Sequence, residues 1–378
     1  MTHWKIPLYK ILVEKEDVNI VSKVISRGMD WAEGSEVTEF EKQLSEYLGV
    51  NYCVTMNSGT SALHALMLAY DIKKNEEILV PSFTFISTVN SSRMVGAIPK
   101  FVDIEEKTYG MDPTLLEKQI SKNSKIILPI HYSGLPCQID KIKNIAKKNK
   151  KILIEDAAES LGAKINNKNI GTFGDASIFS FAGNKVLTTG EGGAVTTNSS
   201  KIYEKLKLIR SHGRKSKNYF HSIQKPEYVE LGYNWRMSSI TAALGLSQLN
   251  KLDRLISLRR KNAQFLNNHL KKIPEIKIPP EPTNFKHVYQ LYSILLTKPK
   301  QRNSLQKFLE SKGIMSKVFF YPVHSSKFYK NRKNISSLKI TEHISKRILS
   351  LPLYPNMTKE ELLLICESIS EFFESKTN

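Results

Sequence analysis

The chain has 378 residues, of which 40% are hydrophobic and 24% charged, and a formal net charge of +20. This length is more than one hydrophobic core usually holds, so we expect a large domain and a smaller one. No apolar run is long enough to cross a bilayer, and the early charges exclude a secretory signal, which favours a cytoplasmic protein.

The excess of positive charge favours an anionic partner, either a nucleic acid or a phosphorylated small molecule. Lysine runs at 143–151 and 330–334 are short and scattered, without the interleaved aromatic residues of a nucleic-acid-binding surface. A lysine-rich composition spread over helix faces explains them more simply, so we do not expect a nucleic-acid partner. The three cysteines lack the spacing of a metal site, and we expect no metal.

Short apolar runs alternate with helical patterns through the first half of the chain. We expect strands at 51–56, 76–82, 99–104, 125–130 and 151–160. Helices are expected over 15–30, within 29–50 and over 57–70. This alternation predicts an α/β fold with a mostly parallel sheet and helices on both faces. Ligands of such sheets bind at the carboxyl ends of the strands.

The second half of the chain has a different pattern. A helix over 203–210 precedes a polar, irregular stretch at 213–232, and a turn that leads into one long helix is then expected within 232–272. A small C-terminal α+β domain is predicted from 288–296, 301–312, 317–324 and a terminal helix over 357–375. We therefore place the large domain at 1–250 and the small one at 251–378, on which the N-terminal segment can pack.

Two glycine-containing stretches carry candidate chemistry. A Ser-Gly-Thr-Ser turn at 58–61 opens directly into an apolar helix, where backbone amides and hydroxyls form an anion site or simply cap the helix. In 176–197, Lys185 lies between a strand and a glycine-rich run. Desolvation there favours the neutral amine, which can condense with a carbonyl.

These features converge on one cofactor, pyridoxal 5'-phosphate (PLP). Its phosphate needs the donors of Gly59, Thr60 and Ser61, and its aldehyde needs an amine such as Lys185. The strand-end carboxylate of Asp156 can keep the pyridine nitrogen protonated, which makes the ring an electron sink. Phe83 and Phe85 supply an aromatic surface, with Phe83 expected in the core.

The chain resembles the DegT/DnrJ/EryC1/StrS aminotransferases, which are fold-type-I PLP enzymes that aminate nucleotide-linked keto sugars. The resemblance covers nearly the whole chain and is carried by the stretches WAEGSEVTEFE (31–41), NSGTSALHAL (57–66), VPSFTFISTVN (80–90), IEDAAESLGA (154–163), GTFGDASIFSFAGNKVLTTGEGGA (171–194), GYNWRM (232–237) and FYPVH (320–324).

The resemblance implies a role for each matching residue. Lys185 forms the Schiff base and shuttles the proton, and Asp156 contacts the pyridinium nitrogen. Gly59, Thr60 and Ser61 bind the phosphate together with Ser180, and Phe85 stacks on the ring. Asn234 reaches the phosphate of a second subunit, which implies a homodimer with shared active sites. His324, Trp31, Glu33 and the loop 213–231 meet the nucleotide sugar, whereas Arg236 is interpreted as structural.

Three residues depart from the usual family pattern. Glu159 stands where many relatives carry Gln beside the phenolic oxygen of PLP, so we expect it to be protonated or turned away. Members that resemble GDP-perosamine synthases share this Glu and the tripeptide at 183–185. Ala182 and Ser133 replace bulkier residues, and both are expected to widen the pocket.

The leading hypothesis is a ping-pong transamination in which glutamate provides the amino group for a 4-keto-6-deoxy sugar linked to GDP or UDP. A 3-keto sugar is the nearest alternative. A PLP-dependent sugar dehydratase is a second, although that branch replaces the Schiff-base Lys by His. A basic regulator that binds nucleic acid is the third, and the nucleotide, the keto carbon and the amino donor stay open.

Overall fold

The computed structural model describes residues 4–215, 222–330 and 337–375. Its largest element is a seven-stranded sheet in the order β1-β9-β8-β5-β4-β2-β3. Strand β9 pairs antiparallel with both of its neighbours, and the remaining pairs are parallel. The predicted mostly parallel sheet is therefore confirmed. The strands span Tyr52–Met56 (β1), Glu77–Pro81 (β2), Ile98–Val102 (β3), Ser124–Ile127 (β4), Ile152–Asp156 (β5), Ala176–Ser180 (β8) and Gly193–Thr197 (β9).

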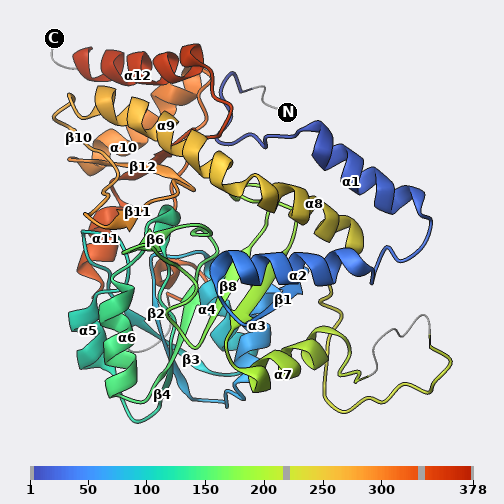
Figure 1. Ribbon diagram of the computed structural model, residues 1–378. Coiled ribbons are helices and arrows are strands. Elements are labelled where there is room, and N and C mark those ends of the chain that lie inside the picture. The colour runs from blue at the N-terminus through green and yellow to red at the C-terminus, as the bar shows by residue number, and fades with distance from the viewer. Residues whose placement is uncertain (1–3, 216–221, 331–336, 376–378) are drawn as a thin grey trace.

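Helices cover both faces of this sheet because its strands are apolar on both sides. Ile126 packs into one buried cluster and its neighbour Ile127 into another. On one face lie α3 (Gly59–Ala69), α4 (Ile86–Met94) and α7 (Ser200–Arg210). Against the other face lie α2 (Ser35–Leu48), α5 (Pro113–Gln119), α6 (Ile139–Lys148) and α8 (Ser239–Asn250), as Figure 1 shows. The predicted α/β class with helices on both faces is confirmed.

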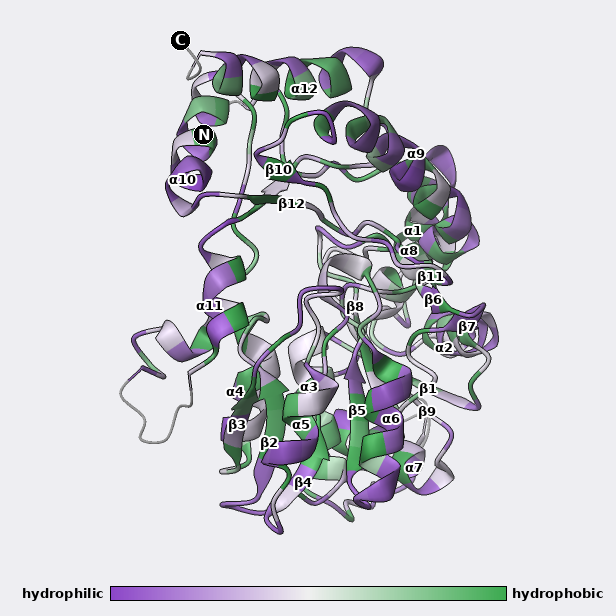
Figure 2. Cartoon of the chain, turned by 90° about the vertical axis from the view of Figure 1, so that its left-hand side faces the viewer, coloured by the Kyte–Doolittle hydropathy of each residue, from purple (hydrophilic) through white to green (hydrophobic). Residues whose placement is uncertain are grey.

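A smaller assembly, here called the small unit, lies beyond one end of the large sheet (Figure 2). Its three-stranded antiparallel sheet has the order β10-β12-β13. Its elements are β10 (Ile276–Lys277), β12 (Tyr292–Leu296), β13 (Ile348–Leu351), α9 (Leu252–Leu270), α10 (Pro299–Ser311) and α12 (Lys359–Glu374). Ile6 packs in the same core and pairs with Ile314. The domain boundary near residue 250 stays a prediction.

The remaining elements are short or peripheral. Helix α1 (Lys15–Ser26) packs on α8, and α11 (Lys339–Ser345) precedes β13. Strands β6 (Lys164–Ile165), β7 (Lys168–Asn169) and β11 (Phe285–Lys286) form a third sheet. Within the described ranges, no helix has both the length and the apolarity needed to cross a membrane.

The long helix expected within 232–272 is wrong, because the structure divides it into α8 and α9 at Lys251. Lys251 has a non-helical φ of −111°. Its ammonium contacts Asp17 and lies 3.4 Å from Glu14, both near the start of α1. The break in the helix therefore lies at the residue whose buried ammonium contacts two carboxylates near the start of α1. The helical periodicity continues across this break, so it is not visible in the sequence.

Candidate active site

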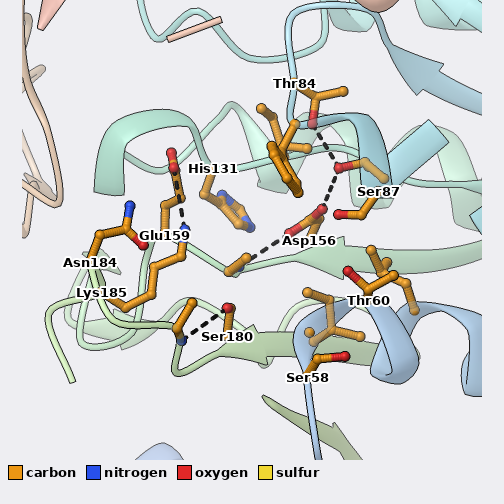
Figure 3. Close-up of a pocket in the computed structure, with 18 of the residues that line it drawn as sticks. Ser58, Thr60, Thr84, Ser87, His131, Asp156, Glu159, Ser180, Asn184 and Lys185 are labelled. Atoms are coloured by element: carbon orange, nitrogen blue, oxygen red, sulfur yellow. Dashed lines mark hydrogen bonds and ion pairs between the residues drawn. The ribbon is translucent and has the colours of Figure 1, made fainter. Parts of the chain in front are cut away.

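A cavity of about 370 Å³ lies where β1, β2, β5 and β8 reach their carboxyl ends (Figure 3). Since these strands run in one direction, residues that follow them meet at one edge of the sheet. The lining includes these residues that the sequence singled out: Gly59, Thr60, Phe85, Asp156, Glu159, Ser180, Ala182 and Lys185. The predicted residues therefore come from four separate segments to one place.

The turn before α3 both caps the helix and lines the cavity. The Ser58 hydroxyl accepts a hydrogen bond from the Ser61 backbone N–H at 3.1 Å, and the Ser61 hydroxyl accepts one from Ser58 N–H at 3.2 Å. Gly59 and Thr60 line the cavity between them, whereas Ser61 is buried outside the lining. The helix start is thus capped by its serines and also open to the cavity, where an anion could bind. A phosphate contact of Ser61 stays a prediction.

Close approach of β9 to this turn requires a glycine. A Cβ placed on Gly193 would lie 2.5 Å from the Ser58 carbonyl and 2.6 Å from the Gly59 nitrogen, both backbone atoms that cannot move alone. Ser180 also packs against the turn, since a Cβ on Gly59 would be 3.1 Å from the Ser180 Cβ. The cavity floor is therefore assembled from backbones packed without side chains between them.

We expect Gly193→Ala to lower the free energy of unfolding by about 1–3 kcal/mol, because the added methyl group overpacks this contact. Gly183→Ala is the matched control, since a Cβ there meets a single atom at an ordinary 3.8 Å. Urea unfolding of both variants tests the difference. Equal stability of the two variants would contradict the close-approach explanation.

Lys185 occupies the connection between β8 and β9, and its side chain points into the cavity (Figure 3). Its Nζ lies 3.4 Å from Oε1 of Glu159, and the two side chains are 14% and 11% exposed. The Gln290 amide donates to the Asn184 carbonyl at 2.6 Å, which fixes the connection from the side of the small unit. The amine is therefore both accessible to a small ligand and held against a carboxylate.

Asp156 ends β5 and is 6% exposed. Its Oδ2 accepts a hydrogen bond from the Thr88 hydroxyl at 2.8 Å, and its Oδ1 accepts one from Ala158 N–H at 3.2 Å. Burial raises the pKa of Asp156 above its ordinary value, against the opposing effects of Thr88 and Lys185. Thr88 in turn contacts the Thr84 hydroxyl at 2.7 Å. A buried carboxylate with a raised pKa is suited to face a cationic group.

Glu159 points towards Lys185 instead of turning away from the cavity (Figure 3). Its Oε2 accepts a hydrogen bond from Ser133 N–H at 2.8 Å. Ser133 itself is buried outside the cavity lining, and its hydroxyl donates to the Leu291 carbonyl at 2.8 Å. The sequence suggested that the small Ser133 side chain would widen the pocket, but Ser133 lies outside this cavity and does not widen it. Ala182 does line the cavity.

Comparison with known proteins identifies the family. The model of the DegT/DnrJ/EryC1/StrS aminotransferase family matches residues 12–370. The chain belongs to this family. It is an aminotransferase, and aminotransferases of this family depend on PLP.

Named relatives of the family cover almost the full length. The GDP-perosamine synthase of Escherichia coli O157:H7 is 34% identical over 372 residues, which are 98% of this chain and 99% of that protein. The GDP-perosamine synthase of Vibrio cholerae is 32% identical over 97% of this chain and 99% of its own. Among solved structures, Helicobacter pylori PseC, an aminotransferase involved in the biosynthesis of pseudoaminic acid, superposes with a TM-score of 0.93. It is 31% identical, over 98% of this chain and 99% of that chain.

Besides Ser61, four residues that the family resemblance assigned to cofactor or substrate lie outside the lining of this cavity: Trp31, Glu33, Asn234 and His324. Asn234 is exposed, and its carbonyl lies 3.5 Å from the Asn57 amide nitrogen. His324 Nδ1 lies 2.7 Å from the Ser82 hydroxyl. The loop 213–231 lies partly outside the described residues, at 216–221. The roles of all these residues stay predictions.

One of them, Glu33, belongs to a charged cluster at a second cavity. Glu33 Oε1 lies 3.0 Å from Arg214 and 3.2 Å from Nε of Arg236, and both arginines line that cavity with it. Trp31 is 46% exposed, and its carbonyl accepts from Ser239 N–H at 2.8 Å. Arg236 both forms an ion pair and lines a cavity, so its structural role stays a prediction.

Several lining residues were missed in the sequence. Phe319 and Phe320 reach the cavity from a segment that follows α10, and Phe320 lies 6.3 Å from Phe85 between ring centroids. Thr84, Ser87 and Thr88 line it from the start of α4. Threonines and phenylalanines are common in cores, so their residue types gave no signal. Thr84, Ser87 and Thr88 lie in the stretch 80–90 and Phe320 in the stretch 320–324, and both stretches carry the family resemblance.

Proposed function

We propose that this aminotransferase uses PLP to move an amino group from glutamate to a 4-keto-6-deoxy sugar linked to a nucleotide. The observation that carries the proposal is the cavity in which Lys185, Asp156 and the start of α3 face one another. The amine matches the aldehyde of PLP, and the buried carboxylate matches its ring nitrogen. The helix N-terminus matches its phosphate.

The residues present fit this cofactor. Gly59 and Thr60 at the start of α3, with Ser180, would hold the phosphate, because helix N-termini bind anions. Asp156 would hold the ring nitrogen, and Phe85, at 58% exposure, would cover one face of the ring. Glu159 would lie near the phenolic oxygen. When bound, PLP supplies an electron sink that stabilises negative charge on the carbon that loses its proton.

The chain's own side chains supply the remaining chemistry. Lys185 Nζ is the group that takes and returns the proton, since it is the amine that lines the cavity beside a carboxylate. Asp156 stabilises positive charge at the ring nitrogen from its buried position. Glu159 holds the amine in place through its 3.4 Å contact. The apolar side chains of Phe319 and Phe320 limit the access of water.

The nature of the sugar is inferred from named relatives and from Glu159, because family members that resemble GDP-perosamine synthases share this Glu. Two of the full-length relatives are named GDP-perosamine synthases, which supports a GDP-linked substrate over a UDP-linked one. A keto carbon at C3 is the alternative. Retention of the Lys disfavours the dehydratase alternative, and the net charge of +20 suits a diphosphate-containing substrate.

The proposal includes a homodimer with shared active sites. Asn234 is exposed and lies outside the cavity of its own chain, so it is available to a partner subunit. Trp31, Glu33 and His324 are proposed to meet the nucleotide sugar. Light scattering of the purified protein would measure the assembly, and a monomeric active enzyme would contradict this part.

We expect amination of a GDP-linked 4-keto-6-deoxy sugar with glutamate as donor, at a kcat/KM at least about tenfold above that of the UDP- and dTDP-linked sugars. Mass spectrometry of the product separates the alternatives, because transamination exchanges oxygen for nitrogen whereas dehydration removes water. A panel without any aminated sugar would contradict the proposal. Nuclear magnetic resonance of the product would identify the aminated carbon.

A further inference from the structure

Beneath the cavity lies a carboxylate that the proposed chemistry does not use. Glu155 is fully buried and accepts hydrogen bonds from the backbone N–H groups of Gly171 at 3.0 Å, Phe173 at 2.7 Å and Gly174 at 2.8 Å. The Ser177 hydroxyl donates a further one at 3.1 Å. Burial alone would raise the pKa of Glu155, but its hydrogen bonds hold that pKa below the ordinary value. Glu155 is therefore an anion with a fixed position.

His131 is the side chain that connects this anion to the cavity. It is 1% exposed and lines the cavity, and its Nε2 lies 3.1 Å from Oε2 of Glu155. Its Nδ1 accepts a hydrogen bond from Cys137 N–H at 3.2 Å. Because one ring nitrogen accepts from a backbone donor, the other must carry the proton and donate to Glu155. The two partners thus fix the tautomer and the ring orientation.

The turn that begins at His131 holds Glu159. His131 N–H donates to the Asp156 carbonyl at 3.2 Å, and Ser133 adopts a left-handed φ of 63°. In this conformation, Ser133 N–H donates to Glu159 at 2.8 Å, and the other oxygen of Glu159 lies 3.4 Å from Lys185. An unbroken series of contacts therefore leads from Glu155 to the amine.

We propose that His131 is a positioning residue that, with Glu155, sets the turn aiming the Glu159 carboxylate at the Lys185 amine. The inference rests on the proposed function, in which Lys185 is the reacting group. It predicts that, in the cofactor-free protein, a carboxylate whose orientation depends on His131 is held against the amine. A carboxylate held against the amine hinders its attack on an electrophile, so the reactivity of Lys185 reports this orientation.

Two substitutions at His131 separate its two contacts. An Asn amide can accept from Cys137 N–H but does not reach Glu155, whereas a Gln amide extends to the Nε2 position and can donate to Glu155. The cofactor-free protein is pulsed with acetic anhydride, and modification of Lys185 is quantified by peptide mass spectrometry. We expect His131→Asn to be modified about threefold faster than wild type, and His131→Gln at nearly the wild-type rate.

A double-mutant cycle tests the route of the effect. Glu159→Gln alone should raise the modification rate about threefold, and adding His131→Asn should raise it no further, because both changes remove the same interaction. Leu309→Ala, in the core of the small unit, is the control for general destabilisation and should leave the rate unchanged. If His131→Asn does not fold, Glu155→Asp, which withdraws the carboxylate from His131, is measured in its place.

The inference is overturned if folded His131→Asn reacts at the wild-type rate, or if its increase persists in the Glu159→Gln background. These outcomes are independent of transamination, since the cofactor is absent from the assay. Failure of the proposed function would instead appear as a wild-type enzyme that aminates no sugar, whatever the rate of Lys185 modification.

Discussion

We expect Lys185→Ala to lower kcat for transamination by at least about a thousandfold, because the change removes the proposed covalent anchor and proton carrier together. The fold should be unaffected, since the Lys185 side chain contributes one 3.4 Å ion pair at the cavity surface. Stopped-flow measurement of a single half-reaction with the amino donor tests this expectation. Added methylamine should restore part of the rate by supplying a free amine in the space that the side chain leaves.

The matched control is Lys201→Ala, which removes an exposed lysine at the start of α7, outside the cavity lining. It should keep full activity. A Lys185→Ala enzyme with more than about a tenth of wild-type kcat would show that another group carries the proton, and the assignment of Lys185 would have to be abandoned.

Asp156→Asn should lower kcat by at least about a hundredfold, because a neutral amide cannot hold a protonated ring nitrogen. The same change should leave the cofactor-free protein equally stable or more stable. Burial raises the pKa of Asp156, so its charged form is disfavoured in the folded state, and an amide removes that cost. Opposite signs for activity and stability distinguish a functional carboxylate from a structural one.

The pH dependence of this stability difference has a definite sign. A carboxyl group whose pKa is higher in the folded state binds protons more tightly there, so its destabilising effect is present above the folded pKa and disappears as the pH falls through it. The advantage of Asp156→Asn in thermal unfolding should therefore be larger at about pH 8 than at about pH 5.

Asp175→Asn serves as the control for the substitution itself. Asp175 accepts a hydrogen bond from Leu153 N–H at 2.8 Å, outside the cavity lining. This variant should keep wild-type kcat. If both variants lost activity equally, the effect at Asp156 would reflect sheet stability and not ring chemistry.

Residue types and the alternation of strands with helices were enough to predict where the site would lie. Asp156 ends a strand of a largely parallel sheet, Lys185 and Gly59 follow two others, and such strands bring their carboxyl ends to one edge. The predicted edge is where the cavity is found. Helix capping at Ser58 and Ser61 was also visible, because the spacing of polar residues at a helix start is local information.

The remaining features depend on contacts between distant segments. Thr88 was missed because its partner, Asp156, is 68 positions away in the chain. The orientation of Glu159 depends on the left-handed backbone of Ser133, a conformation that cannot be predicted from the presence of a serine. The break at Lys251 likewise depends on α1. Sequence patterns predict elements and edges, whereas hydrogen-bond partners across the fold require the three-dimensional arrangement.

The pairing of Ile6 with Ile314 has a consequence for the synthesis of the chain. Leu353 N–H also donates to the Leu8 carbonyl at 3.3 Å, so the first segment belongs to a core most of whose other members lie after residue 262. Contacts with such large sequence separation slow folding, and they leave apolar surface open until the ribosome has made most of the protein. Until then, Ile6 and Leu8 are candidate sites for a chaperone.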